Sequence, residues 1–144
     1  MIGFNYNDGG RTAAGFKGTC KDCAIRAIAI ATGKNYKDIY TDIRNLIARF
    51  NEESKINYRK SVRQGVPAPV CKYYLEQLGW RWVPTMKFGK GCTTHLNKEE
   101  LPSGIIIARL SKHFTAIING IINDTYDCSR DGNRCVYGYF IKED

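Results

Sequence analysis

A cysteine near the start of the chain has the local surroundings that a nucleophilic thiol needs. Cys23 directly follows Asp22, a residue type that favours the N-cap of a helix, and precedes a run rich in Ala and Ile. A thiol in the first turn of a helix is stabilised as thiolate by the helix dipole and by free backbone N–H groups. The backbone N–H of Cys23 would also be in position to bind an oxyanion. The sequence therefore predicts a reactive thiol at Cys23, with a small core cysteine as the alternative interpretation.

A histidine and its acidic partner are predicted from one hairpin near the end of the chain. Asn119-Gly120 is a typical two-residue type I′ turn. In the register that this turn sets, Asp124 is the diagonal neighbour of His113, and alternation along the strands places both side chains on one face. Two other polar residues of this region fall on the opposite face: Asn123 and Asp127. We therefore expect Asp124 to orient His113, the alternative being a histidine at an exposed sheet edge.

Metal binding is a competing interpretation of the cysteines. Cys20-Lys21-Asp22-Cys23 has the two-residue spacing of a zinc knuckle, and Cys128 or Cys135 with a histidine would complete such a site. No second short-spaced pair exists, since Cys128 and Cys135 are seven residues apart. A redox Cys-x-x-Cys is a further alternative, although no strand is expected before it. We therefore expect no metal and no cofactor, and we place His95 in a surface loop or at the rim of a substrate groove.

These residues must be positioned by helices in the first half of the chain and by strands in the second. The apolar spacing and the capping residues predict helices at 22–32, 36–50 and 67–78, and a short helical turn at 98–101. Strands are expected at 80–83, 104–110, 112–118, 121–126 and 136–142. Residues 1–21 are expected to be irregular and 51–66 to form a polar loop. This order predicts an α+β domain, 1–144, with the nucleophile helix packed on a C-terminal antiparallel sheet.

Composition indicates how many domains the chain forms, where it is expected to be located and which partners its charge attracts. At 144 residues, with 43% apolar and 25% charged residues, the chain matches one ordinary globular domain. The sequence has neither a basic and apolar leader nor a long apolar run, so we expect a cytoplasmic protein with no membrane partner, in a bacterium or in an infected host cell. In that compartment we expect all six cysteines to be free thiols. The net charge of +8 attracts acidic partners, nucleic acid included, although only residues 58–63 form a basic cluster.

The spacing of the chemical residues resembles that of a known superfamily. Asp22-Cys23 at a helix start, His113 opening a strand and Asp124 one hairpin later are similar to the papain-like cysteine peptidases. The nearest members in layout are the bacteriocin-processing leader peptidases and the cell-wall endopeptidases of the NlpC type. The resemblance implies a papain-like fold in which Cys23 is the nucleophile, His113 the general base and later acid, and Asp124 the residue that orients the imidazole.

One position departs from the superfamily pattern. Papain-like and bacteriocin-processing peptidases carry a glutamine six residues before the cysteine, where this chain has Lys17. The oxyanion or substrate donor would then come from elsewhere, and three candidates precede the cysteine: Asn5, Asn7 and Thr19. Most of the chain also resembles a group of small phage and bacterial proteins, through the segments 4–11, 13–18, 78–84 and 110–113. That second likeness implies no activity.

Two functions are consistent with these residues. The first is a cysteine hydrolase, virus- or prophage-encoded, that cuts a peptide or amide bond in a peptide or protein substrate through a thioester; an acyl transferase is a near variant. The second is a catalytically degenerate basic protein that keeps the fold and binds a host protein or nucleic acid.

Overall fold

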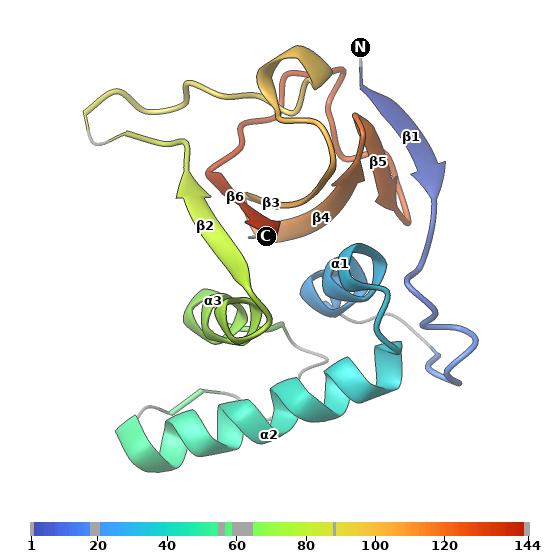
Figure 1. Ribbon diagram of the computed structural model, residues 1–144, viewed down its shortest axis with the longest axis vertical. Helices are drawn as coiled ribbons and strands as arrows, with labels where there is room; N and C mark the ends of the chain where they lie inside the picture. The colour runs from blue at the N-terminus through green and yellow to red at the C-terminus, as the bar shows by residue number, and fades with distance from the viewer. Residues whose placement is uncertain (1, 18–20, 55–56, 59–64, 88, 143–144) are drawn as a thin grey trace.

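The computed structural model describes residues 2–17, 21–54, 57–58, 65–87 and 89–142. The helices are α1 (Cys23–Thr32), α2 (Tyr36–Ser54) and α3 (Ala68–Gln77), with a 3₁₀ turn η2 (Lys98–Glu100) (Figure 1). The strands are β1 (Gly3–Tyr6), β2 (Trp80–Pro84), β3 (Ile105–Leu110), β4 (His113–Ile118), β5 (Ile121–Asp124) and β6 (Gly138–Lys142). The α+β class predicted from the sequence is confirmed.

All strands belong to one sheet, in the order β1-β5-β4-β3-β6-β2. Its pairs are antiparallel except β1 with β5, which run parallel, so the expectation of a purely antiparallel sheet is wrong at this edge. The expectation that residues 1–21 are irregular is wrong for β1 as well. Phe4, Asn5 and Tyr6 are all exposed, so β1 lacks the alternation of buried and exposed residues that marks a strand in sequence. Its backbone pairing to β5 makes it a strand.

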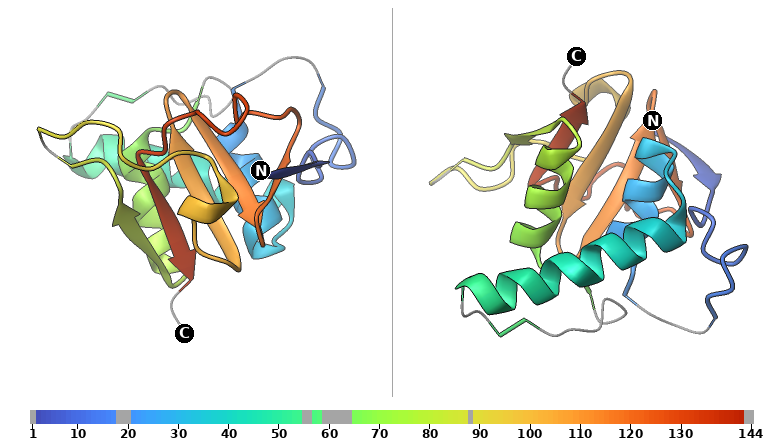
Figure 2. Two further views of the ribbon diagram at one scale, coloured as in Figure 1. Left: turned by 90° about the horizontal axis from the view of Figure 1, so that it is seen from above. Right: turned by 60° about the horizontal axis from the view of Figure 1, so that its bottom comes forward.

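Helices cover one face of the sheet in two tiers (Figures 1 and 2). The helices α1 and α3 lie next to the strands, and α2 packs across these two helices. The α1 residues Ile25 and Ile28 are fully buried in the core between the tiers and the sheet. The predicted α2 stripe is also buried, with Ile39, Ile43 and Ile47 facing that core. The helix continues to Ser54, beyond the expected end at residue 50.

The opposite face of the sheet is covered by loops. Leu96 and Val136, from the segments around η2 and before β6, pack on Ile106 and Ile117 of the central strands in a second apolar cluster. The buried Arg134 donates through Nη2 to the carbonyl of Ser111, 2.8 Å away, and so ties these loops to the β3–β4 turn. The turn at the start of β4 is therefore held from this face, while α1 holds the strand from the other.

A glycine ends α1, as the capping pattern predicts. Gly33 adopts the left-handed conformation, with φ 73°, and its N–H donates to the Ala29 carbonyl.

No helix within the described ranges is both long and apolar enough to cross a membrane. The predicted basic cluster at 58–63 lies outside the described residues after Tyr58.

Candidate active site

Cys23 is the first residue of α1 and is half-buried. Its helix packs against β4, whose first residue is His113, so Cys23 and His113 are brought to the same part of the fold from distant segments of the chain. Both residues line one pocket of about 710 Å³. Backbone N–H groups in the first turn of a helix have no intrahelical acceptor, which leaves the start of α1 able to bind developing negative charge.

The hairpin register joins His113 to Asp124. Asn119 and Gly120 both have positive φ, 49° and 76°, as a type I′ turn requires. The strands pair Ile118 with Ile121, as predicted. His113 Nε2 then lies 2.7 Å from Asp124 Oδ2, and both side chains are buried, 7% and 3% exposed. Because Nε2 is engaged by the carboxylate, Nδ1 is the ring nitrogen left for proton transfer.

Further hydrogen bonds fix the carboxylate of Asp124. Thr115 Oγ1 donates to Asp124 Oδ2 across the hairpin, at 2.8 Å. The backbone N–H of Thr125 donates to the other oxygen, Oδ1, at 2.7 Å. The carboxylate therefore cannot rotate freely, and it holds the imidazole in one orientation.

The protonation state of the pair follows from these contacts. Burial alone would lower the pKa of His113, but its hydrogen bond to Asp124 and its interactions with the thiols of Cys128 and Cys23 raise that pKa to about 11. Burial would raise the pKa of Asp124, and the hydrogen bonds from His113 and its neighbours lower it instead. The pair is thus an imidazolium and a carboxylate at neutral pH. A cationic imidazole beside a thiol favours the thiolate form.

A second thiol lies behind the histidine. Cys128 is 1% exposed, and its Sγ is 3.8 Å from Asp124 Oδ2. It interacts with His113 as well, but it does not line the pocket. Of the two thiols beside His113, only Cys23 therefore faces the pocket.

Asp22 departs from its predicted role as a helix cap. It occupies the N-cap position of α1, but its side chain makes no cap hydrogen bond. The carboxylate turns inward instead, where it pairs with Arg26 and Arg11 and accepts a hydrogen bond from Tyr36. The carboxylate binds the two arginines and the tyrosine hydroxyl in preference to the backbone N–H groups of the helix, because leaving a buried arginine unpaired would strongly destabilise the fold.

The described charged side chains that line the pocket around Cys23 are all basic. Its described lining includes no aspartate or glutamate, but it has four basic residues: Lys21, Arg26, Arg109 and Lys112. Aromatic side chains complete the walls. Tyr126 is 48% exposed, and its ring centroid lies 5.3 Å from that of His113. The site is therefore open, basic and partly aromatic.

The candidate oxyanion donors do not gather at this pocket. Asn5 donates through Nδ2 to Asn123 Oδ1 at 2.9 Å, and Asn7 accepts from the backbone N–H of Gly9. Neither of them lines the pocket, and Thr19 lies outside the described residues. Lys17, at the position of the superfamily's glutamine, is exposed. Cys23 N–H remains the candidate donor on the described part of the chain.

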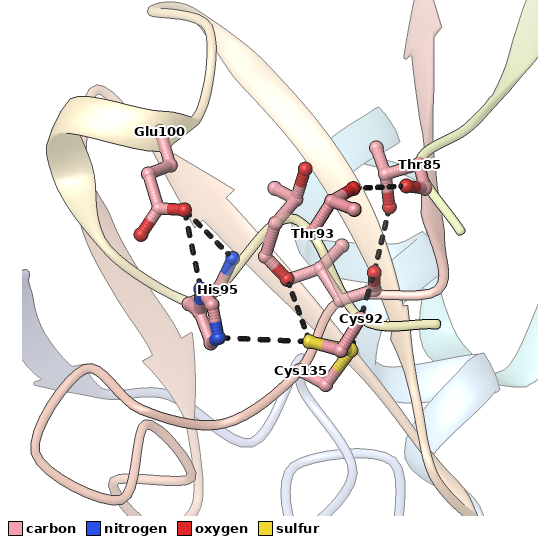
Figure 3. Close-up of a disulfide and its surroundings, with 8 residues drawn as sticks. Thr85, Cys92, Thr93, His95, Glu100 and Cys135 are labelled. Atoms are coloured by element: carbon pink, nitrogen blue, oxygen red, sulfur yellow. Dashed lines mark hydrogen bonds and ion pairs between the residues drawn. A yellow bond between two sulfur atoms is a disulfide. The ribbon is translucent and has the colours of Figure 1, made fainter. Parts of the chain in front are cut away.

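The predicted free thiols at two positions are wrong, because Cys92 and Cys135 form a disulfide (Figure 3). Their Cα atoms are 5.9 Å apart. Three further cysteines are free within the described ranges: Cys23, Cys71 and Cys128. The bridge joins the loop after β2 to the segment before β6, a pairing that depends on the sheet order and not on the spacing of the two residues.

Two of the cysteines that were candidate zinc ligands are not available as ligands in the described structure. Cys135 is held in the disulfide, and Cys20 lies outside the described residues. A buried trio brings potential ligand atoms within 4.8 Å of one another: His113, Asp124 and Cys128. These atoms already engage each other through the His113–Asp124 hydrogen bond, which a metal would have to replace.

Comparisons with known proteins give no relative. No protein-family model, curated protein or solved structure matches the chain.

Sequence reasoning missed three contributors to the site. Arg26 has no role in the sequence-based prediction of the site, but its Nη2 lies 3.7 Å from Asp124 Oδ1. Thr115 has none either, but its hydroxyl donates to Asp124. Cys128 enters the sequence-based prediction only as a zinc ligand. The hairpin register itself carried the signal for Thr115, since it pairs that residue with Asp124.

Proposed function

We propose that this chain is a papain-like cysteine hydrolase that cleaves a peptide or amide bond through a Cys23 thioester. The observation that carries the proposal is the 2.7 Å bond from His113 Nε2 to Asp124 Oδ2, beside a half-buried thiol at a helix start in a pocket. An ordered carboxylate, imidazole and thiol are what acyl transfer to sulfur requires.

The groups support a two-step reaction. The Cys23 thiolate attacks the carbonyl carbon, and the oxyanion that forms is stabilised by the N–H of Cys23 at the start of α1. His113 gives its proton to the leaving amine, which departs as the C–N bond breaks. Neutral His113 then takes a proton from water, whose oxygen attacks the thioester and releases the acid and the thiolate. Asp124 holds the ring throughout and stabilises each imidazolium.

Alkylation tests the reactive thiol without knowledge of the substrate. We expect iodoacetamide, below stoichiometric amounts at pH 6.5, to label Cys23 first, as read by peptide mapping. Cys71 is the internal control, because it is fully buried and burial raises its pKa to about 12. His113→Ala should abolish the preference for Cys23. Equal, slow labelling of Cys23 and Cys71 in the wild-type chain would contradict a catalytic thiol.

Turnover needs a second experiment. A panel of electrophilic probes with peptide, ubiquitin-like and muropeptide recognition elements would identify the acyl group that Cys23 accepts. The matching unmodified substrate should then be cleaved by the wild-type chain and not by Cys23→Ala. Labelling of Cys23 without cleavage of any matching substrate would count against the hydrolase.

One observation favours a binding function as the second candidate. No described acid lines the pocket. His113 and Arg26 are already paired with buried carboxylates, but Lys21, Arg109 and Lys112 also line it, which suits an acidic ligand. A protein that binds without chemistry would retain an acidic peptide or oligonucleotide in Cys23→Ala, with an affinity that falls steeply with salt. A salt-independent or undetectable interaction would remove this candidate.

A further inference from the structure

A second cysteine, histidine and glutamate lie together away from the pocket. The disulfide partner Cys92 is exposed, and Cys135 is half-buried. His95 Nε2 is 3.6 Å from Cys92 Sγ, and Figure 3 shows this contact beside the disulfide. The imidazole therefore contacts the accessible sulfur of the bridge.

Glu100 orients this second imidazole. Its Oε1 lies 3.2 Å from His95 Nδ1 and also accepts from the backbone N–H of His95, at 3.3 Å. A carboxylate on Nδ1 fixes the tautomer and leaves Nε2 directed at the sulfur (Figure 3). The 3₁₀ turn η2 supplies Glu100, and its Asn97 cap accepts from Glu99 N–H, which fixes the distance between carboxylate and ring.

The backbone around the bridge is held independently of the sulfur atoms. Val136 N–H donates to the Thr94 carbonyl at 2.9 Å, and Leu96 N–H donates to the Arg134 carbonyl at 2.8 Å. Thr85 Oγ1 adds a hydrogen bond to the Val136 carbonyl at 2.6 Å. Opening the disulfide would therefore leave Cys92 and Cys135 close together, as a reversible couple requires.

We infer that Cys92–Cys135 is a thiol–disulfide exchange site for dithiol reductants, with His95 and Glu100 serving the exposed Cys92 sulfur. A thiolate of the dithiol attacks Cys92 Sγ, the S–S bond breaks, and its electron pair and then a proton go to Cys135 Sγ. The second thiol of the reductant gives its proton to His95 Nε2 and attacks the mixed disulfide, and His95 passes that proton to the Cys92 thiolate as it leaves. The dithiol is oxidised to a disulfide, and the bridge gains two electrons and two protons. This inference does not depend on Cys23.

The leaving step is where the histidine acts. A thiolate that receives a proton from a neighbouring imidazole as it departs leaves faster than one that does not. In the reverse direction the same contact makes Cys92 the attacking thiolate, and Cys135 then resolves the mixed disulfide. The half-buried position of Cys135 suits a resolving thiol, because it keeps external disulfides away.

The rate at which the Cys92–Cys135 disulfide is reduced in the oxidised 144-residue chain tests the inference. Dithiothreitol is the probe, and thiol release at Cys92 and Cys135 is followed by alkylation and peptide mapping at pH 7. His95→Gln should slow reduction about tenfold, since the leaving thiolate loses its proton donor. Glu100→Gln should slow it by a smaller factor, since the imidazole remains but loses the carboxylate that orients it. Glu99→Gln is the matched control, with the same charge change one residue away, and should react like wild type. Equal rates in wild type and His95→Gln would overturn the inference.

A second measurement separates reactivity from altered folding. In Cys135→Ser, the freed Cys92 should react rapidly with an aromatic disulfide such as 5,5′-dithiobis(2-nitrobenzoate), releasing thionitrobenzoate and keeping the adduct on Cys92. Adding His95→Gln should slow this adduct formation severalfold while circular dichroism stays unchanged. Adduct formation at Cys92 that is no faster than at the buried Cys71, or that is unaffected by His95→Gln, would equally refute the site.

Discussion

Arg26 Nη2 lies 3.7 Å from Asp124 Oδ1, so the arginine one turn into α1 touches the carboxylate that holds His113. The same guanidinium pairs with Asp22, the residue before Cys23. Arg26 thus links the start of α1 to the end of β5 through two buried carboxylates, and the helix that carries Cys23 is fixed to the hairpin that carries His113.

Removing this link should destabilise the fold. Arg26→Met leaves Asp22 and Asp124 buried with one cation fewer, and we expect a loss of about 3 kcal/mol in the free energy of unfolding, measured by urea titration. Arg49→Met is the matched control, because Arg49 pairs only with the exposed Glu53 among described acids. That variant should change stability by less than about 0.5 kcal/mol. Similar losses in both variants would contradict the link.

Asp124 should control the reactivity of Cys23. In Asp124→Asn the imidazolium loses its anionic partner, so neutral His113 no longer favours the thiolate, and alkylation of Cys23 at pH 6.5 should slow by at least about tenfold. Any catalytic rate should fall by about 10²–10⁴. Asp127→Asn is the control, since Asp127 is exposed and lies beyond the end of β5. A wild-type alkylation rate in Asp124→Asn would remove Asp124 from the site.

Stability should depend on pH through the same pair. His113 has a folded pKa of about 11, above its ordinary value of 6.5, so its contribution is fully present below pH 6.5 and is lost as pH rises toward 11. The difference in unfolding free energy between wild type and His113→Gln should therefore shrink with rising pH, by up to about 1.4 kcal/mol per pH unit. The lowered pKa of Asp124 acts oppositely: its contribution is present above its ordinary pKa and is lost as acid protonates it. A constant difference from pH 6.5 to 10 would contradict the ion pair.

Gly138 is required by a close approach of two strands. A Cβ at this position would lie 2.3 Å from the Trp82 ring and 2.9 Å from the Val83 carbonyl oxygen. The ring packs on Phe140 with centroids 4.8 Å apart, which restricts its retreat. We expect Gly138→Ala to lower stability by about 1–3 kcal/mol in thermal or urea unfolding. Gly3→Ala, where the nearest atom is 3.4 Å away, is the strand-glycine control and should be nearly neutral; the reverse order would refute the packing argument.

The disulfide should stabilise the chain by limiting its unfolded state. Cys92 and Cys135 are separated by 43 residues, for which the chain-entropy relation gives about 4 kcal/mol. The double variant Cys92→Ser/Cys135→Ser should lose an amount of this order relative to the oxidised wild type. Wild type kept reduced should resemble the double variant. A loss below about 1 kcal/mol would mean that the unfolded chain is already restricted there.

Local signals were sufficient for the hairpin and the helices. The Asn119-Gly120 turn determines the β4–β5 register, and that register alone selects Asp124 as the partner of His113. The α1 boundaries follow from Asp22 and Gly33 to within one residue. These features depend on residues close in sequence, where turn chemistry and apolar spacing act directly.

Features that depend on distant segments were not predictable. Asp22 was expected to cap its own helix, but Arg11 and Tyr36 draw the carboxylate inward, and nothing in the local spacing indicates their approach. The pairing of Cys92 with Cys135 requires the order of strands in the sheet. Lone cysteines give no information about such pairings.

The parallel pairing of β1 with β5 has a consequence for synthesis on the ribosome. Gly3 pairs with Ile121, so β1 leaves the exit tunnel well before the strand with which it pairs has been made. The exposed Phe4 and Tyr6 remain unpaired during that interval. Closure of this sheet edge is thus a late event in folding, and it occurs at the strand that ends in Asp124. The carboxylate of the candidate site receives this neighbouring strand only when two segments far apart in the sequence have come together.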